Sequence, residues 1–379
     1  MIQLKGIAWN HSRGFTSVVA TAQRYEELNP GVRISWEKRS LQAFADAPMG
    51  QLAAAYDLIV MDHPHTAVAA ESGALLALDE WIPADFLADQ AANSVGRSHE
   101  SYSHLGHQWT LATDAATPIA TWRPDLIDKH NLKLPRTWGD VLELAARGHV
   151  AVSLFPVDVL MHVYMFCHAL GTPCFSEKKE VAPSDSLAKA LECLKELGRL
   201  CGPESFERNP IRTAEHMTLT DQAAYCPFAY GYSNYSRPRY ARTVLKAGGL
   251  VEFQGTRLRS TLGGAGLAVS SKTAHAEAAA DYARFSASPE IQRGIYFEAG
   301  GQPGHRTAWT DAAVNAASND FFRDTLETLD EAIVRPGYAG YTQFQDAASP
   351  VAHEYVAGKA GLPATIETLN RIYQQSLPL

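Results

Sequence analysis

Apolar and polar positions alternate in short blocks over the first third of the chain. Residues 2–9 carry apolar side chains at positions 2, 4, 7 and 9, which predicts a strand. Residues 16–28 have apolar side chains at helical spacing, and Asn29-Pro30-Gly31 ends that helix. The same pattern predicts strands at 32–36 and 56–61 and helices at 45–55 and 65–72. This alternation predicts a parallel sheet with helices on both faces.

A second block of elements begins near Pro118. Thr137 and Asp140 form a capping box, which opens a helix that runs through Ala146. Further strands are predicted at 119–122, 149–154, 223–228 and 262–269, and further helices from Pro124 and at 157–170, 184–200 and 272–287. Ser288 is expected to cap one more helix, which ends at 300–301, and the tail from Phe321 on is mostly helical.

Length and charge narrow the classes of function. A chain of 379 residues exceeds the roughly 250–300 residues at which a single core stops growing, so two lobes are expected. The net charge of -8 argues against bulk nucleic-acid or anionic-membrane binding. We find no apolar run of about 18 residues, so no membrane insertion is expected. The five cysteines form no Cys-x-x-Cys pair, and we interpret them as small buried hydrophobic residues.

The sequence starts directly at its first predicted strand, without a basic segment, a long apolar segment or a cleavage site. Two localisations therefore remain open. The protein is cytoplasmic, or it is periplasmic and its export signal has been removed.

Four segments in a fixed order resemble a known family. They are Leu28-Asn-Pro-Gly-Val-Arg-Ile34; Tyr56-Asp-Leu-Ile-Val-Met-Asp62 with Ser72-Gly-Ala-Leu-Leu-Ala-Leu-Asp79; Leu134-Pro-Arg-Thr-Trp-Gly-Asp140; and Leu262-Gly-Gly-Ala-Gly-Leu-Ala-Val-Ser270 with Ser288-Pro-Glu290 and Gly301-Gln-Pro303. Together they resemble the family 1 extracellular solute-binding proteins, which include maltose-binding protein. The chain looks like the members that lack a signal, in which His-x-Arg-Gly follows the first strand and Asp-His-Pro-His follows the third.

The resemblance implies the α/β, two-lobed periplasmic-binding-protein fold of type II. Each lobe would be a mixed, mainly parallel sheet flanked by helices, with a ligand cleft between the lobes. Lobe 1 would comprise residues 1–112 and 261–308, and lobe 2 residues 113–260 and 309–379. The ligand would bind by hinge closure to a monomer, and neither a cofactor nor a bound metal is expected.

In this fold the loop after the first strand lies at the cleft, which makes Trp9, Asn10, His11, Arg13 and Gly14 candidate ligand contacts. The Arg13 guanidinium and the helix N-terminus behind it suit an anion such as a carboxylate or phosphate. Gly14 would let the backbone approach the ligand closely. The alternative is that Arg13 pairs with a surface acid and that His11 caps the helix.

Asp62, His63 and His65 follow the third strand, where they could bind metal, act as general acid and base, or donate hydrogen bonds. Zinc prefers three or four ligands, and His-Pro-His presents its rings in awkward directions, so we predict hydrogen bonding to ligand. Thr113 and Asp114 at the crossing between lobes would accept hydrogen bonds from the ligand, with a plain turn as the alternative.

The remaining candidates are spread over both lobes. Tyr230, Tyr232 and Asn234 form an aromatic, hydroxyl-rich loop suited to sugar rings, with aromatic packing as the alternative. The other predicted ligand contacts are Arg39, Phe155, Gly263, Gly264, Gln302 and Arg306, and Tyr338, Tyr341 and Gln343 are weaker candidates. His104-x-x-His107 has no carboxylate or cysteine at ligand spacing, and we interpret it as a solvated loop.

These residues predict a protein that binds one small polar solute, either a carbohydrate or an anionic metabolite, and that is not an enzyme. Arg13 and the histidines favour an anion. If the protein is exported, its partner would be the membrane permease of an ABC transporter. The alternative is a cytoplasmic enzyme or sensor in which His11, His63, His65 and Asp114 perform acid–base chemistry in the same cleft.

Overall fold

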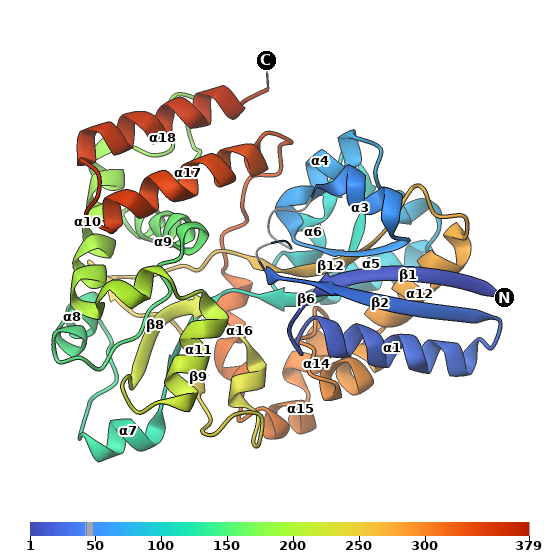
Figure 1. Cartoon of the computed structure of the whole chain (residues 1–379), viewed down its shortest axis with the longest axis horizontal. Helices are drawn as coiled ribbons and strands as arrows, with labels where there is room; N and C mark the ends of the chain where they lie inside the picture. The colour runs from blue at the N-terminus through green and yellow to red at the C-terminus, as the bar shows by residue number, and fades with distance from the viewer. Residues whose placement is uncertain (42, 44–47, 379) are drawn as a thin grey trace. The chain divides into compact units, whose positions relative to one another are not determined.

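The computed structural model of the chain describes residues 1–41, 43 and 48–378. They divide into two compact units (Figure 1). Unit 1 comprises Met1–Ala116, Leu262–Ala316 and Gly337–Ala339, and unit 2 comprises Thr117–Thr261, Ala317–Pro336 and Gly340–Leu379. In the described part of the chain, no helix has both the length and the apolar character needed to cross a membrane.

Unit 1 is an α/β layer structure. Its elements are β1 (Ile2–Trp9), α1 (Phe15–Leu28), β2 (Val32–Arg39), α3 (Met49–Ala55), β3 (Leu58–Met61), η1 (His63–His65), α4 (Thr66–Glu71), η2 (Leu78–Glu80), α5 (Ala84–Asn93), α6 (Ser98–Ser101), β4 (Ser103–His104), β5 (His107–Gln108), β6 (Thr110–Ala116), β12 (Gly263–Val269), α12 (Ala276–Ala287), α13 (Pro289–Ile291), η5 (Gln292–Tyr296), α14 (Arg306–Thr310) and α15 (Ala312–Ala317).

The sheet of unit 1 has the order β2-β1-β3-β12-β6. β1 pairs in parallel with β2 and β3, whereas β12 pairs antiparallel with both β3 and β6. It follows that β1, β2, β3 and β6 all run in one direction. Their carboxyl ends and the amino end of β12 therefore meet at one edge, which we call the carboxyl edge of unit 1.

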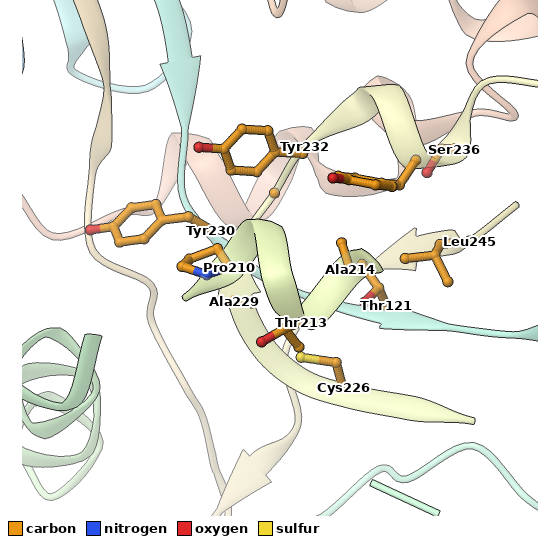
Figure 2. A pocket seen from close by; sticks show the side chains of 12 residues that line it. Thr121, Pro210, Thr213, Ala214, Cys226, Ala229, Tyr230, Tyr232, Ser236 and Leu245 are labelled. Atoms are coloured by element: carbon orange, nitrogen blue, oxygen red, sulfur yellow. The ribbon is translucent and has the colours of Figure 1, made fainter. Parts of the chain in front are cut away.

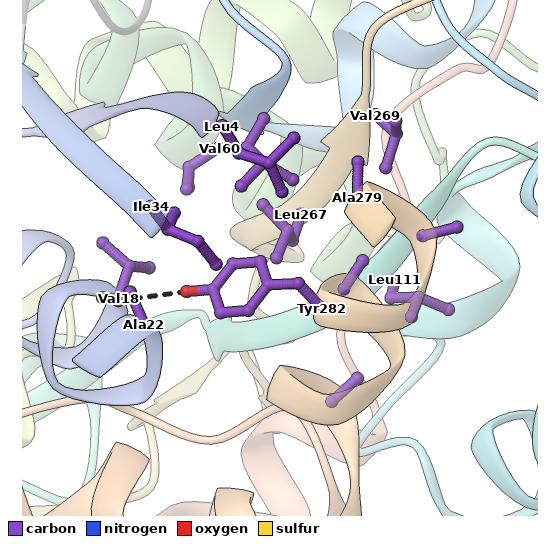
Figure 3. Close-up of a cluster of buried hydrophobic side chains, with 14 of the residues drawn as sticks. Leu4, Val18, Ala22, Ile34, Val60, Leu111, Leu267, Val269, Ala279 and Tyr282 are labelled. Atoms are coloured by element: carbon purple, nitrogen blue, oxygen red, sulfur yellow. Dashed lines mark hydrogen bonds between the residues drawn. The ribbon is translucent and has the colours of Figure 1, made fainter. Parts of the chain in front are cut away.

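Alternate residues of the central strands pack into two cores. On one face, Leu58 and Val60 of β3 pack with α1 and α12, where Tyr282 donates a hydrogen bond to the Val18 carbonyl at 3.0 Å (Figure 3). On the other face, Ile59 and Met61 pack against α3 and α4. Successive side chains of a strand point to opposite faces, so this short apolar strand is buried on both sides.

Unit 2 is rich in helices. Its elements are β7 (Pro118–Trp122), α7 (Pro124–Lys129), α8 (Trp138–Ala146), α9 (Pro156–Ala169), α10 (Ser184–Cys201), η3 (Pro203–Phe206), α11 (Pro210–Leu219), β8 (Tyr225–Tyr230), η4 (Ser233–Ser236), β9 (Lys246–Gly248), β10 (Glu252–Phe253), β11 (Thr256–Arg257), α16 (Phe321–Asp330), α17 (Tyr341–Val356) and α18 (Leu362–Ser376).

Helix α9 is the centre of unit 2. Its residues from Asp158 to Cys167 are all buried, as expected of a helix that is apolar on all sides, and it packs against α10 and α17 (Figure 1). The sheet has the order β8-β7-β9, and all of these pairings are antiparallel. The mainly parallel sheet expected for this half of the chain is therefore wrong.

Several predicted elements need correction. The predicted strand 149–154 is extended, but it forms only the parallel bridge between Val150 and Tyr225, on the side of β8 away from β7. The predicted helix 272–287 begins at Ala276. Residues 45–47 of the predicted helix 45–55 lie outside the described residues. The capping box of Thr137 and Asp140 is confirmed, with both reciprocal hydrogen bonds present.

Candidate functional site at the carboxyl edge of unit 1

Most of the predicted contacts from unit 1 lie at its carboxyl edge. Arg39 pairs in register with Trp9, and Gly264 with Ala115. The residues at this edge come from the loop after β1, the end of β2, the turn after β3, the end of β6 and the start of β12. They are Trp9, Asn10, His11, Arg13, Gly14, Arg39, Asp62, His63, His65, Thr113, Asp114, Gly263 and Gly264. The β-α-β order brings these residues together, because strands that run in the same direction end at the same edge of the sheet.

Arg13 and Asp114 form a buried ion pair with two hydrogen bonds. Nε of Arg13 lies 2.8 Å from Oδ2 of Asp114, and Nη2 lies 2.5 Å from Oδ1. The two side chains are 4% and 1% exposed. Burial raises the pKa of Asp114, and the guanidinium of Arg13 and the backbone N–H of Ala265 oppose that rise. The positive charge that we expected to attract an anion is therefore balanced within the protein.

His11 is poorly suited to acid–base chemistry. Its Nδ1 accepts a hydrogen bond from the Arg13 backbone N–H at 3.0 Å. Burial, together with the nearby Arg13 charge, lowers the pKa of His11 to about 3. The ring is therefore neutral at physiological pH and can serve as a hydrogen-bonding group rather than as a base of ordinary strength.

The turn after β3 is held by its own polar groups. Oδ1 of Asp62 accepts from the His63 backbone N–H at 2.8 Å and so caps η1. His63 is 5% exposed, and its Nε2 lies 3.2 Å from the Leu262 carbonyl oxygen of the neighbouring chain segment. His65 is also 5% exposed. Among the described residues no group of three or more His, Cys, Asp and Glu side chains could hold a metal ion.

The glycines at this edge allow protein segments to approach each other. A Cβ on Gly14 would lie 2.3 Å from the Trp9 ring, so Gly14 makes room for a buried tryptophan, and the close ligand approach expected there stays a prediction. Gly264 has φ +107°, and a Cβ there would lie 2.5 Å from the Asp114 carbonyl oxygen. Gly264 therefore lets β12 pass close to β6.

Other candidates serve structural contacts within unit 1. Gln302 is 1% exposed, and its Nε2 donates to the Ala115 carbonyl at 2.8 Å. Arg306 reaches the Ser94 carbonyl at 3.4 Å, and Arg39 donates to the Ala43 carbonyl at 3.0 Å. Burial lowers the pKa of Arg39 to about 10. Asn10 is exposed at the edge.

Sequence reasoning missed Tyr296, which is buried beneath this edge. It lies in η5, a π-helical turn, and burial, together with the nearby Asp114 charge, raises the pKa of its phenol well above the ordinary value. Ser17 of α1 donates to the Arg13 carbonyl at 2.9 Å. No motif marks Tyr296, because the π-helical shift that directs its ring has no sequence signature beyond Gly294, where the backbone leaves helical values.

Three of the unit 2 candidates, Tyr230, Tyr232 and Asn234, lie at or just after the carboxyl end of β8. Tyr230 ends β8, and its hydroxyl lies 3.2 Å from Oγ1 of Thr261. Asn234 is 1% exposed, whereas Phe155 is partly exposed as the N-cap residue of α9. Tyr230 and Tyr232 border a small pocket (Figure 2). Its volume of about 20 Å³ is sufficient for one water molecule.

Two further sequence interpretations need correction. His104 and His107 are paired across a two-stranded hairpin, and each lies 2.9 Å from a carboxylate, Glu71 and Asp79 respectively. Both acids come from other segments of unit 1, so the local sequence could not reveal them. Tyr341 is fully buried, and its hydroxyl lies 3.3 Å from that of Tyr164 in the core of unit 2, which excludes ligand contact in this structure.

Comparison with known proteins identifies the fold of this chain. The profile of the bacterial extracellular solute-binding protein family matches residues 8–154. Maltose-bound MalE3 of T. maritima superposes with a TM-score of 0.86 at 17% identity and covers 100% of both chains. The chain has the fold of the bacterial extracellular solute-binding proteins. This result confirms the resemblance and the fold class inferred from the sequence.

Two other solute-binding proteins of ABC transporters share this fold. The Agrobacterium radiobacter protein in complex with ribitol has a TM-score of 0.84 at 18% identity, over 99% of both chains. The Thermotoga lettingae protein bound with α-D-tagatose has a TM-score of 0.83 at 16% identity, over 98% of this chain and 100% of that one. A search of the curated proteins finds no match.

Proposed function

We propose that the protein binds one small, neutral, polyhydroxylated solute and delivers it to the permease of an ABC transporter. The Arg13–Asp114 pair is the observation that favours a neutral solute. Both oxygens of the carboxylate and two nitrogens of the guanidinium are already engaged, so neither charge is left for a ligand of opposite sign. A neutral polyol needs hydrogen-bonding groups without a net charge.

The chemistry of the carboxyl edge of unit 1 supports this proposal. His11 stays neutral at physiological pH, and Asp62 and Asn10 are accessible polar groups at the same edge. In unit 2, Tyr230 adds a partly exposed ring with a hydroxyl group. Aromatic faces with nearby polar groups suit the apolar faces and hydroxyls of sugars and polyols.

The relatives support a transport role. The matching family is described as extracellular, and the structurally similar proteins bound to ribitol and tagatose are named as ABC transporter components. The acid–base alternative has less support, because the pKa of His11 is lowered to about 3 and Asp114 is bound to Arg13.

The proposal is tested by identifying the solute that the protein carries. Protein purified from its own host is analysed by native mass spectrometry and then unfolded in guanidinium chloride, and the released small molecules are identified. We expect a neutral sugar or polyol of unchanged mass. A bound organic acid or phosphate, or a mixture of substrate and product masses, would contradict the proposal.

A further inference from the structure

A pocket of about 100 Å³ lies within unit 2, beside the end of helix α9. It is bordered by Tyr164 and His168 of α9, by Phe175 of the loop that follows, and by Val334 and Arg335 of the segment between α16 and α17. A single water molecule needs only about 10–15 Å³, so this pocket has room for a small organic molecule. None of the residues that line it was a candidate contact for the proposed solute.

One wall of the pocket is aromatic and firmly held. Phe175 has φ +66°, which a bulky residue rarely adopts, and its backbone N–H donates to the Val181 carbonyl at 2.7 Å. Its ring packs edge-on, at centroid distances between 5.2 and 5.9 Å, against the rings of Tyr164, Tyr341, Phe344 and Tyr373. Because these contacts already fix the ring, the wall is preformed for the apolar part of a ligand.

The charged side chains at this pocket are positive. Arg335 lines it, is 5% exposed, and donates from Nη1 to the amide oxygen of Gln345, a neutral acceptor, at 3.2 Å. Arg259 lies next to the pocket, because its Nη1 is 3.1 Å from Nε2 of His168. The Nε of Arg259 donates to the Glu331 carbonyl at 2.8 Å. No Asp or Glu side chain is among the described residues that line the pocket.

His168 is a neutral hydrogen-bond donor at this pocket. A guanidinium group only donates hydrogen bonds, so Nε2 of His168 accepts from Arg259 and the ring proton lies on Nδ1. Burial, together with the Arg259 charge, lowers the pKa of His168, and the ring is therefore neutral at physiological pH. The pocket thus combines apolar walls with cationic and hydrogen-bond-donating groups, which suits an apolar chain that ends in a carboxylate.

We propose that this pocket of unit 2 is a second binding site, which takes a short-chain monocarboxylate such as butyrate. The apolar chain of the ligand contacts Phe175 and Val334. Its carboxylate accepts hydrogen bonds from Arg335 and from the Nδ1–H group of His168. This site goes beyond the proposed function, because it takes a different class of ligand at residues that the proposed solute does not use.

The test begins with two ligands of equal chain length. Butyrate and 1-butanol are each titrated into the whole chain, and ligand-observed ¹H NMR gives their dissociation constants. We expect butyrate to bind at least about 10-fold more tightly, because only butyrate carries a negative charge for the arginines. Equal affinities of the two ligands, or no binding of butyrate, overturn the proposal.

Substitution of the arginine then locates the carboxylate. Arg335→Met keeps a long side chain without its charge, and we expect it to weaken butyrate binding about 10-fold or more and to change 1-butanol binding by less than about 2-fold. Arg257→Met is the control, because Arg257 is half-exposed, pairs with Glu327 and does not line the pocket. Unchanged butyrate affinity in Arg335→Met overturns the proposal.

Val334 provides a test that does not depend on the folding of Arg335→Met. Val334→Phe fills the pocket and should weaken butyrate binding about 10-fold or more, whereas Val334→Ala enlarges it and should shift the preference from butyrate towards hexanoate. The same chain-length preference in the parent and in Val334→Ala overturns the proposal. A carboxylic acid that co-purifies because of this pocket is lost in Val334→Phe, whereas one held at the carboxyl edge of unit 1 is retained, so failure of this proposal is distinguishable from failure of the proposed function.

Discussion

The guanidinium of Arg13 bonds to both carboxylate oxygens of Asp114, at 2.8 and 2.5 Å, although 101 positions separate the two residues in the sequence. Each was a candidate ligand contact, and each instead satisfies the other. Charges this deeply buried are stable only when paired and hydrogen-bonded. The pair therefore makes the carboxyl edge of unit 1 less charged than its sequence indicates.

Breaking this pair from one side should be costly. Arg13→Ala leaves the buried Asp114 carboxylate without its partner, and we expect the free energy of unfolding to fall by about 3–5 kcal/mol in urea denaturation. Arg13→Ala with Asp114→Ala should recover part of that loss. Lys5→Ala serves as the control, because it breaks the exposed pair with Glu37 and should cost at most about 1 kcal/mol. Equal effects of the two single variants would contradict burial of the Arg13–Asp114 pair.

Gly304 should not tolerate alanine. A Cβ there would lie 1.9 Å from the Ala112 carbonyl oxygen, which belongs to the β6 backbone and cannot rotate away. We expect Gly304→Ala to lower the free energy of unfolding by about 3 kcal/mol or more, or to prevent folding. In Gly31→Ala the new methyl group meets nothing within 4 Å, so its melting temperature should stay close to that of the parent. Thermal melts followed by circular dichroism give both values.

His162 is expected to destabilise the protein. Neither of its ring nitrogens has a hydrogen-bond partner among the described residues, and the ring is 1% exposed beside Phe228. We expect His162→Leu to raise the free energy of unfolding by about 1–2 kcal/mol at pH 7, because an unsatisfied buried polar group is removed. The exposed His130→Leu should change it by less than about 0.5 kcal/mol.

His162→Leu should also change how the free energy of unfolding depends on pH. Burial lowers the pKa of His162 to about 3, below the value near 6.5 expected in the unfolded chain. The unfolded state then binds a proton that the folded state does not bind, so the stability of the parent falls as the pH drops from about 6.5 towards 3. His162→Leu should lose less stability over that range. Parallel curves for parent and variant would contradict the burial of a neutral ring.

Asp158 should produce the opposite dependence. Burial raises its pKa to about 7, although the Ser153 hydroxyl donates to it at 2.5 Å. The folded state holds a proton that the unfolded chain releases above about pH 4, so stability declines between pH 4 and 7, by at most about 1.4 kcal/mol per pH unit. Asp158→Asn should remove this decline, whereas the exposed Asp185→Asn should not. Urea denaturation across that pH range provides the comparison.

Patterns that act over short distances along the chain predicted much of the fold. The helix start at Trp138 follows from the capping box of Thr137 and Asp140, which is local. The strand Leu58–Met61 follows from an uninterrupted apolar run that is buried on both faces. The predicted strand at 149–154 failed because pairing depends on which neighbour lies alongside, and that information is not local.

The candidate site was predicted in its location but not in its electrostatics. Topology alone placed Arg13 and His63 at one edge, since both follow strands that end there. The partners that satisfy them, Asp114 and the Leu262 carbonyl, are distant in sequence. Tyr296 was missed because the π-helical turn that places its buried ring has no sequence signature beyond Gly294.

The most direct test of solute class is a calorimetric titration of ligand-free protein with ribitol and with ribonate, which differ by a carboxylate in place of a terminal alcohol. Because the Arg13 charge is already paired with Asp114, we predict that ribitol or a related polyol or sugar binds and that the matching carboxylate binds at least about 10-fold more weakly. Tighter binding of the carboxylate would contradict the account.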